Sequence, residues 1–229
     1  MSFTWKDYLL TGIVLWIVIL ADFFIIHISV LLVKQLPLEY QGIVRILTFF
    51  VVFFILLGVV YARILRIIRP FHDVIFSSSD QSLRCLLWKQ TVFTYEWTAS
   101  ILAYITPVLL RPFLYRMLGA KLGKGVLIGG KIVEPQMVTM GDYSFAGEMS
   151  LLMAHAMMRD KVVLKSIIIG NYASIGSHAV IMPGVRIGNE SIVAAGAIVP
   201  MDTVIPPGEV WGGIPAKKLK VVEKFDVRS

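Results

Sequence analysis

The sequence predicts a two-part protein, in which an α-helical membrane hairpin precedes an all-β, left-handed parallel β-helix built from hexapeptide repeats. Two observations lead to this fold class. The first half holds two apolar runs, each about long enough to span the hydrocarbon core of a bilayer. In the second half an apolar residue returns at every sixth position, which is the period of neither an α-helix nor a simple strand. The chain of 229 residues is 57% hydrophobic, which is high for an ordinary soluble domain.

The membrane hairpin is predicted within residues 1–69. The two runs are TGIVLWIVILADFFIIHISVLLV at 11–33 and IVRILTFFVVFFILLGVVYARIL at 43–65, and the turn between them contains a proline and a glycine. Three arginines, Arg63, Arg66 and Arg69, lie at or just after the end of the second run, against only Lys34 and Arg45 in and beside the turn. By the positive-inside rule this favours a multi-pass membrane protein with two spans and a β-helix domain on the cytoplasmic side.

Residues 70–117 are predicted to form a linker of amphipathic helices lying in the membrane interface. This stretch is rich in apolar and aromatic residues, but prolines and charged residues interrupt it. Amphipathic sequences of this kind lie along a bilayer surface more readily than they cross it. A third span at residues 92–110 is the alternative, and it would reverse the side on which the C-terminal domain sits.

The six-residue period is clearest near the C-terminus. The recurring apolar residues are Ile169, Ile175, Ile181, Ile187, Val193, Val199, Ile205 and Trp211. Short strands that turn a corner every six residues form a triangular coil of about eighteen residues, and stacked coils bury one continuous core. The β-helix is therefore predicted over 118–220, followed by a tail at 221–229.

The same phase continues upstream from Leu122, with Glu134 as its one charged member, but it breaks between Leu152 and Ile169. These two residues are seventeen positions apart, so we expect an excursion from the coil at about residues 157–166. An excursion from a regular solenoid is a favoured place for function.

The C-terminal half resembles the hexapeptide-repeat acyltransferases. The phrase IGSHAVIMPGVRIGNESIVAAGAIVPMDTVIPPGEVWGGIPAKKLK is similar to their usual ending. The preceding segment, which includes VTMGDYSFAGEMSLLMAHAMMRDKVVLKS, looks most like the C-terminal domains of ε-poly-lysine synthetases and related membrane-linked proteins. The resemblance covers residues 118–220 and implies acyl transfer from a thioester. No adenylation or carrier domain is recognisable, which argues against amino-acid activation by this chain alone.

His155 is the predicted general base, because it stands just before the excursion and because imidazole titrates near neutral pH. Asp160 is the candidate to orient its ring, as the third member of a catalytic triad does. A structural role for His155 at a coil corner is the competing interpretation. His178, the other histidine of the repeats, is expected to be a surface or protomer-contact residue.

The resemblance implies a homotrimer with active sites between neighbouring β-helices. It also implies that Ala194, Ala195 and Gly196 meet the pantetheine arm of acetyl-CoA or another acyl-CoA, and that Lys217 and Lys218 lie near its phosphates. An acyl-carrier-protein thioester is the alternative donor. The predicted acceptor is a hydroxyl or amine on a membrane-proximal small molecule or lipid-linked sugar.

Two other functions compete with acyl transfer. One is a non-catalytic β-helix scaffold or assembly subunit of a membrane complex, which need not bind CoA. The other is a zinc protein like the γ-class carbonic anhydrases, but two histidines with no nearby cysteine fit a zinc site poorly, so no metal is expected. The formal charge of +7 is not gathered into a basic run with aromatics, so no nucleic acid is expected either.

Overall fold

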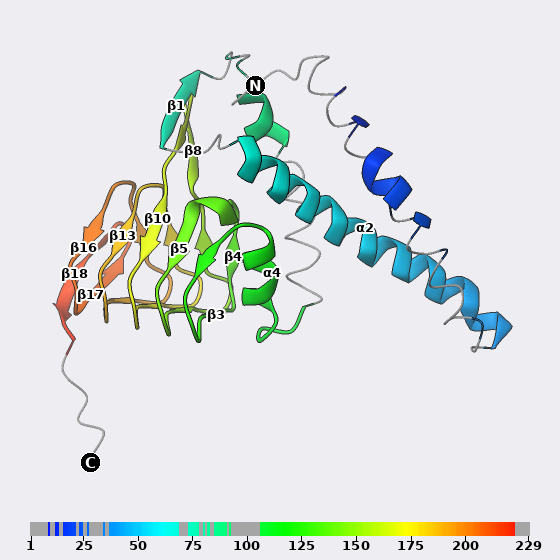
Figure 1. Cartoon of the computed structure of the whole chain (residues 1–229). Helices are drawn as coiled ribbons and strands as arrows, with labels where there is room; N and C mark the ends of the chain where they lie inside the picture. Colours follow the sequence, from blue (N-terminus) through cyan, green and yellow to red (C-terminus); the bar gives the residue numbers. More distant parts are fainter. Residues whose placement is uncertain are drawn as a thin grey trace.

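The computed structural model describes residues 37–68, 73–77, 85–90 and 106–222, together with isolated positions elsewhere before residue 106. Figure 1 shows a stack of coils with the long helix α2 (Leu38–Ile68) running away from it, and a small sheet containing β1 (Val74–Ser77) and β8 (His155–Met158) rising from the stack. The stack holds the candidate site, so the description centres on it.

The stack is a three-sided parallel β-helix, as predicted. Its strands fall into three sheets, each with neighbours one coil apart in the chain. The first sheet contains β2 (Lys121–Leu122), β5 (Val138–Met140), β10 (Ile167–Ile169), β13 (Arg186–Ile187) and β16 (Val204–Ile205). The second contains β3 (Leu127–Ile128), β6 (Phe145–Ala146), β11 (Ser174–Ile175), β14 (Ile192–Val193), β17 (Glu209–Gly213) and β18 (Ala216–Val221). The third contains β4 (Lys131–Ile132), β7 (Leu151–Leu152), β12 (Val180–Ile181) and β15 (Ile198–Val199).

The core of the prism is the column of inward-pointing residues that the period predicts. From Ile169 to Ile205 every sixth residue is buried. The fifth residue of each hexad is small or β-branched and is also buried where the coil turns, as at Ala173, Ala179 and Val185. Burial of one aliphatic side chain of this size stabilises a fold by roughly 1.5–3 kcal/mol, so the column contributes to the stability of the stack at every coil.

One corner of the prism carries a ladder of side-chain amides and carboxylates. Asn189 Oδ1 accepts the N–H of Asn171 at 2.9 Å, and Asn171 Oδ1 accepts the N–H of Asp142 at 2.8 Å. Asp142 Oδ1 in turn accepts the N–H of Lys124 at 2.7 Å. Each step therefore satisfies a backbone donor of the coil before it, which a tight turn would otherwise leave unpaired.

The first coil does not keep the six-residue period, and this changes the place of Glu134. The inward residue of β4 is Ile132, four positions after Ile128 rather than six. The corner between them is only Gly129 and Gly130, and a Cβ on Gly130 would lie 2.2 Å from the carbonyl oxygen of Ser150. The next corner is lengthened to compensate and contains the 3₁₀ turn η1 (Pro135–Met137). Glu134 therefore lies in a corner rather than in the apolar column.

The predicted excursion is a β-hairpin. Strand β8 pairs antiparallel with β9 (Lys161–Leu164), and Arg159 and Asp160 form the turn. Strand β1, from far upstream in the chain, adds to the other edge of β9, with Val74 opposite Leu164 and Ser77 opposite Lys161. This three-stranded sheet is the only antiparallel sheet outside the C-terminal coil among the described residues.

Both ends of the prism are covered. Helix α4 (Arg111–Met117) lies against the first coil, where the buried hydroxyl of Tyr115 accepts the N–H of Ile132 at 3.2 Å. At the other end β18 folds back antiparallel onto β17. The described parts of 70–117 thus pack on the β-helix, whereas the sequence predicted helices lying in a membrane interface.

The predicted membrane hairpin is corrected by the structure. Within the residues described, no helix combines the length and the apolar character needed to cross a bilayer. The second predicted span does form a helix, α2, whose uncharged stretch runs from 46 to 62, between Arg45 and Arg63. The multi-pass location and the cytoplasmic side were predicted from that hairpin, so these two predictions are wrong as well.

The first predicted span, residues 11–33, lies mostly outside the described residues, and so does the alternative third span at 92–110.

Candidate active site

A buried carboxylate meets the predicted base. His155 Nδ1 contacts Glu134 Oε1, and Glu134 Oε2 accepts the backbone N–H of Ala154 at 2.9 Å. The side chain of Glu134 is 1% exposed and that of His155 is 18% exposed. The two residues meet because they occupy the same corner of consecutive coils, after β4 and after β7. We call this edge of the prism, residues 133–137, 153–166, 182–185 and 200–203, the Glu134 corner.

This contact selects one form of the imidazole. An ionised carboxylate can only accept hydrogen bonds, so a neutral imidazole beside it donates from Nδ1 and keeps its lone pair on Nε2. A carboxylate at Nδ1 also fixes the direction in which Nε2 points, as a general base requires.

The predicted partner Asp160 is not beside His155. It lies in the turn at the far end of the β8–β9 hairpin, and its backbone oxygen accepts the hydroxyl of Ser77 at 3.4 Å. Strand residues advance about 3.3 Å each, so the turn lies roughly 10 Å from His155. The carboxylate that the structure brings to the ring is that of Glu134, which the sequence marks only as the charged member of an apolar phase.

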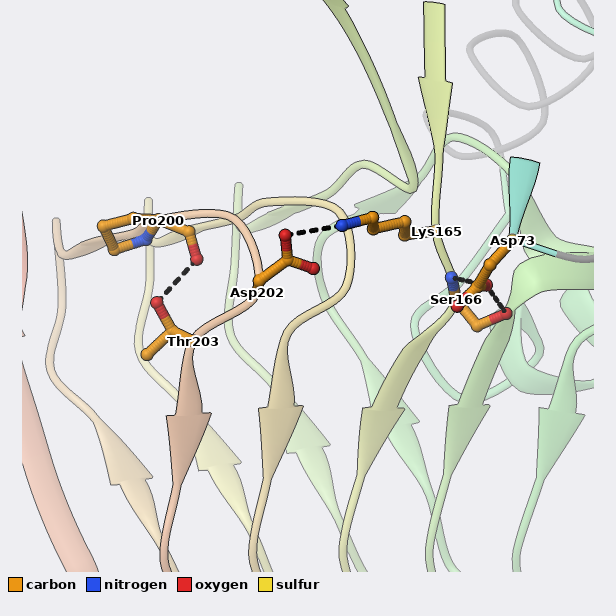
Figure 2. A network of polar contacts seen from close by, with 6 residues as sticks. All are labelled: Asp73, Lys165, Ser166, Pro200, Asp202 and Thr203. Carbon is orange, nitrogen blue, oxygen red and sulfur yellow. Dashed lines mark hydrogen bonds and ion pairs between the residues drawn. The ribbon is translucent and has the colours of Figure 1, made fainter. Parts of the chain in front are cut away.

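The ends of the hairpin are fixed by polar contacts at the same corner (Figure 2). Asp73 Oδ1 accepts the N–H of Ser166 at 2.8 Å and its hydroxyl at 3.0 Å, just where the chain re-enters the coil. Lys165 Nζ lies 2.6 Å from Asp202 Oδ2, two coils further along. These contacts fix the hairpin where the chain re-enters the coil. The position of His155 therefore does not depend on the turn residues alone.

The residues predicted to bind the donor lie on a different edge of the prism. Ala194, Ala195 and Gly196 form the corner after β14, where Gly196 N–H donates to the carbonyl of Ser177 at 2.9 Å. Ala195 and Gly196 are exposed. We call this edge, residues 147–150, 176–179 and 194–197, the Ala195 corner. Within one chain, sheet β4-β7-β12-β15 separates it from the Glu134 corner.

The two predicted lysines differ in their surroundings. Lys218 Nζ lies 2.6 Å from Glu209 Oε1, and Trp211 Nε1–H donates to Glu209 Oε2 at 2.8 Å. The ammonium of Lys218 and the indole N–H of Trp211 hold the pKa of Glu209 below its ordinary value. Lys217 is exposed on β18 opposite Gly212, one coil beyond Ala194. Of the pair, Lys217 is therefore the more available to a phosphate.

His178 lies on the Ala195 corner, away from Glu134. It is exposed, and its backbone adopts a left-handed conformation with φ of 60° at the turn. Its N–H donates to the carbonyl of Glu148 at 3.0 Å, as other corner residues do to the coil before them. The described residues contain no group of three histidine, cysteine, aspartate or glutamate side chains that could hold a metal ion.

Comparison with known proteins supports acyl-group chemistry. Residues 166–200 match the bacterial transferase hexapeptide family, described as six repeats. YvoF of Bacillus subtilis, named as a candidate acetyltransferase, is 28% identical over 120 residues, which are 52% of this chain and 69% of that protein. The δ-poly-L-ornithine synthetase of Acinetobacter baumannii is 31% identical over 146 residues, 60% of this chain but 11% of the synthetase.

Two further likenesses concern proteins named as acetyltransferases. Galactoside O-acetyltransferase of Escherichia coli is 47% identical over 60 residues, 26% of this chain and 29% of that enzyme. A hexapeptide-repeat acetyltransferase of Vibrio cholerae, solved with acetyl coenzyme A, shares the fold with a TM-score of 0.50 and 20% identity over 63% of this chain and 92% of its own. The chain thus spans only a small part of the synthetase and of the galactoside enzyme.

The prediction of an acyltransferase is confirmed at the level of the enzyme class, and the predicted acyl-CoA donor is the ligand of the Vibrio cholerae structure. Hexapeptide repeats folded as a three-sided β-helix are common to this chain and that structure.

Proposed function

We propose that the protein transfers an acetyl group from acetyl-CoA to a hydroxyl or amine, with His155 as the general base and Glu134 as the carboxylate that orients it. The observation that carries this proposal is the contact between His155 Nδ1 and the buried carboxylate of Glu134 beside the break in the coils. A buried carboxylate is costly unless it is paired, and its position here leaves Nε2 as the one basic nitrogen of the ring.

The reaction follows from that geometry. The acceptor hydroxyl or amine attacks the carbonyl carbon of the thioester while His155 Nε2 takes its proton. The resulting imidazolium is stabilised by the negative charge of Glu134. The tetrahedral intermediate then collapses, the carbon–sulfur bond breaks, and the leaving thiolate takes the proton from Nε2. The products are the acetylated acceptor and CoA, and the histidine returns to its starting form.

A homotrimer would bring the two separated corners together. His155 follows β7 and Ala195 follows β14, so their coils are two apart along the prism. At about 4.8 Å per coil this is roughly 10 Å of axial distance, and Lys217 lies about one coil further on. A donor along the groove between two chains would then run from the acetyl group at His155 of one chain to the phosphates at Lys217 of the next. Closed three-fold symmetry repeats that groove three times.

The names of two relatives suggest which acceptors to test. One is named for acetylating the oxygen of a galactoside, and another for making a polymer of ornithine, which carries amines. A sugar hydroxyl and a primary amine are accordingly the two acceptors to be tried.

The test is acetyl-CoA-dependent turnover by wild type and by His155→Ala, measured as CoA thiol release with galactosides and primary amines as acceptors. We expect kcat to fall about 10²–10⁴-fold in His155→Ala. Acetyl-CoA should still raise the melting temperature of the variant, because a ligand stabilises the state it binds. Unchanged turnover in folded His155→Ala contradicts the assignment of the base, and absence of acetyl-CoA stabilisation in wild type contradicts the donor.

A further inference from the structure

A segment that precedes the repeats is built into the break of the β-helix. Strand β1 pairs with β9 along its whole length, while Asp73 binds Ser166 where the chain re-enters the coil and Ser77 binds Asp160 in the turn. The helical residues 85–90 follow β1 and are largely buried. These residues lie outside the part of the chain that matches the hexapeptide family, 166–200. The wall of the site is therefore made partly by sequence that the repeats do not contain.

Trp88 carries this segment to the base. Its ring is 2% exposed and meets the imidazole of His155 edge to face, with centroids 5.6 Å apart and planes at 65°. It also meets Phe76 of β1 edge to face, at 5.5 Å and 61°. The indole thus contacts both the upstream strand and the imidazole.

Two contacts of the imidazole hold different parts of it. The Glu134 carboxylate meets the ring at Nδ1, and the indole of Trp88 meets it edge to face. An aromatic edge against the ring restricts its plane, and so restricts the direction in which Nε2 presents its lone pair. Catalytic groups must be held within about 0.5 Å of the productive position.

We propose that Trp88 is a positioning residue for His155, so that the segment containing β1 and residues 85–90 is part of the acyltransferase site. This inference rests on the proposed function, since it assigns Trp88 a role through the base. Trp88 orients the imidazole and takes no proton itself.

Trp88 can be replaced by phenylalanine without loss of a hydrogen bond. Trp88 Nε1 is buried and has no hydrogen-bond acceptor among the described residues. Trp88→Phe therefore removes no hydrogen bond and keeps an aromatic edge, whereas Trp88→Leu keeps bulk and removes the aromatic contact. Ile187→Ala provides a destabilised control, because Ile187 is a core residue of β13 in a regular coil.

The experiment compares kcat and the KM for acetyl-CoA in these variants and in a double-mutant cycle with His155→Ala. We expect Trp88→Leu to lower kcat about 10–100-fold, as small misplacements of catalytic groups do, with KM within about twofold. Trp88→Phe should stay within about threefold of wild type. In the His155→Ala background Trp88→Leu should have almost no further effect, because the group it positions is gone.

Three results would overturn the inference: wild-type kcat in folded Trp88→Leu, an equal loss in Ile187→Ala, or an undiminished effect of Trp88→Leu without His155. The cycle also separates the two proposals. If His155→Ala is inactive while Trp88→Leu is fully active, only the role of Trp88 fails; if His155→Ala is fully active, the proposed base fails as well.

Discussion

The coils from β10 to β16 are regular, whereas the two coils before them have the same three-sided architecture with irregular corners. In the later coils every sixth residue is inward and each corner repeats the previous one. In the earlier coils one corner shrinks to Gly129 and Gly130, the next grows to hold Glu134, and the same corner of the following coil opens into a hairpin. The polar pair of Glu134 and His155 lies where these irregularities coincide.

The difference shows how a solenoid acquires a chemical site. A regular coil has no interior place for a carboxylate, because its inward positions form a close-packed apolar column. Shifting two residues from one corner to the next creates such a place without disturbing the coils that follow, since the total per coil is conserved. The regular coils then supply an exposed edge at Ala195, and the irregular coils hold His155, the proposed base.

A substitution in the irregular region should lower kcat strongly and change the stability of the fold little. We expect Glu134→Gln to lower kcat about 10²–10⁴-fold, as amide replacement does in other histidine–carboxylate pairs. The amide oxygen can still accept the N–H of Ala154, but the amide nitrogen would donate to Nδ1 and leave the proton of the ring on Nε2. Steady-state kinetics combined with thermal unfolding measures both effects, and a Glu134→Gln enzyme with wild-type kcat would show that the carboxylate does not orient the base.

The regular region should behave in the opposite way. Ile187→Ala removes a buried aliphatic side chain from the column, so we expect the free energy of unfolding to fall by about 2–5 kcal/mol. Turnover per folded molecule should remain within about twofold of wild type at a temperature where the variant stays folded. Denaturant titration and kinetics on the same preparation test this, and a kcat loss matching that of Glu134→Gln would erase the distinction between the two regions.

The smallest effect concerns Glu209, a half-buried carboxylate of the last coil. The pKa of Glu209 is held down by Lys218 and Trp211, so its contribution to stability is present above its ordinary value of 4.5 and is lost as the pH falls through the lowered pKa. Glu209→Gln should therefore melt slightly below wild type at pH 7 and together with it in strong acid. A difference in melting temperature that grows on acidification would mean that the pair has the opposite sign.

The sequence predicts the regular coils almost residue by residue, because an inward position recurs wherever Ile169, Ile181 or Val193 stands in phase. It also locates the break and His155. Glu134 is missed as the partner because a shortening of two residues and a later lengthening cancel, which leaves the phase intact on both sides. The pairing of Val74 with Leu164 could not be predicted from the sequence either, because no local pattern indicates which distant strands pair. The membrane hairpin predicted from the apolar N-terminal half is wrong for the described residues, where no helix combines the length and the apolar character needed to cross a bilayer.

The division of labour between the two edges can be tested by mixing two damaged chains. His155→Ala removes the base from the Glu134 corner, and Ala195→Trp should block the donor at the exposed Ala195 corner. The two variants carry different affinity tags, are coexpressed and are purified through both tags, and native mass spectrometry verifies mixed trimers. If each site joins the base of one chain to the donor edge of the next, every mixed trimer contains one intact interface, so we expect about one third of wild-type activity. Mixed trimers as inactive as either parent would contradict the shared site.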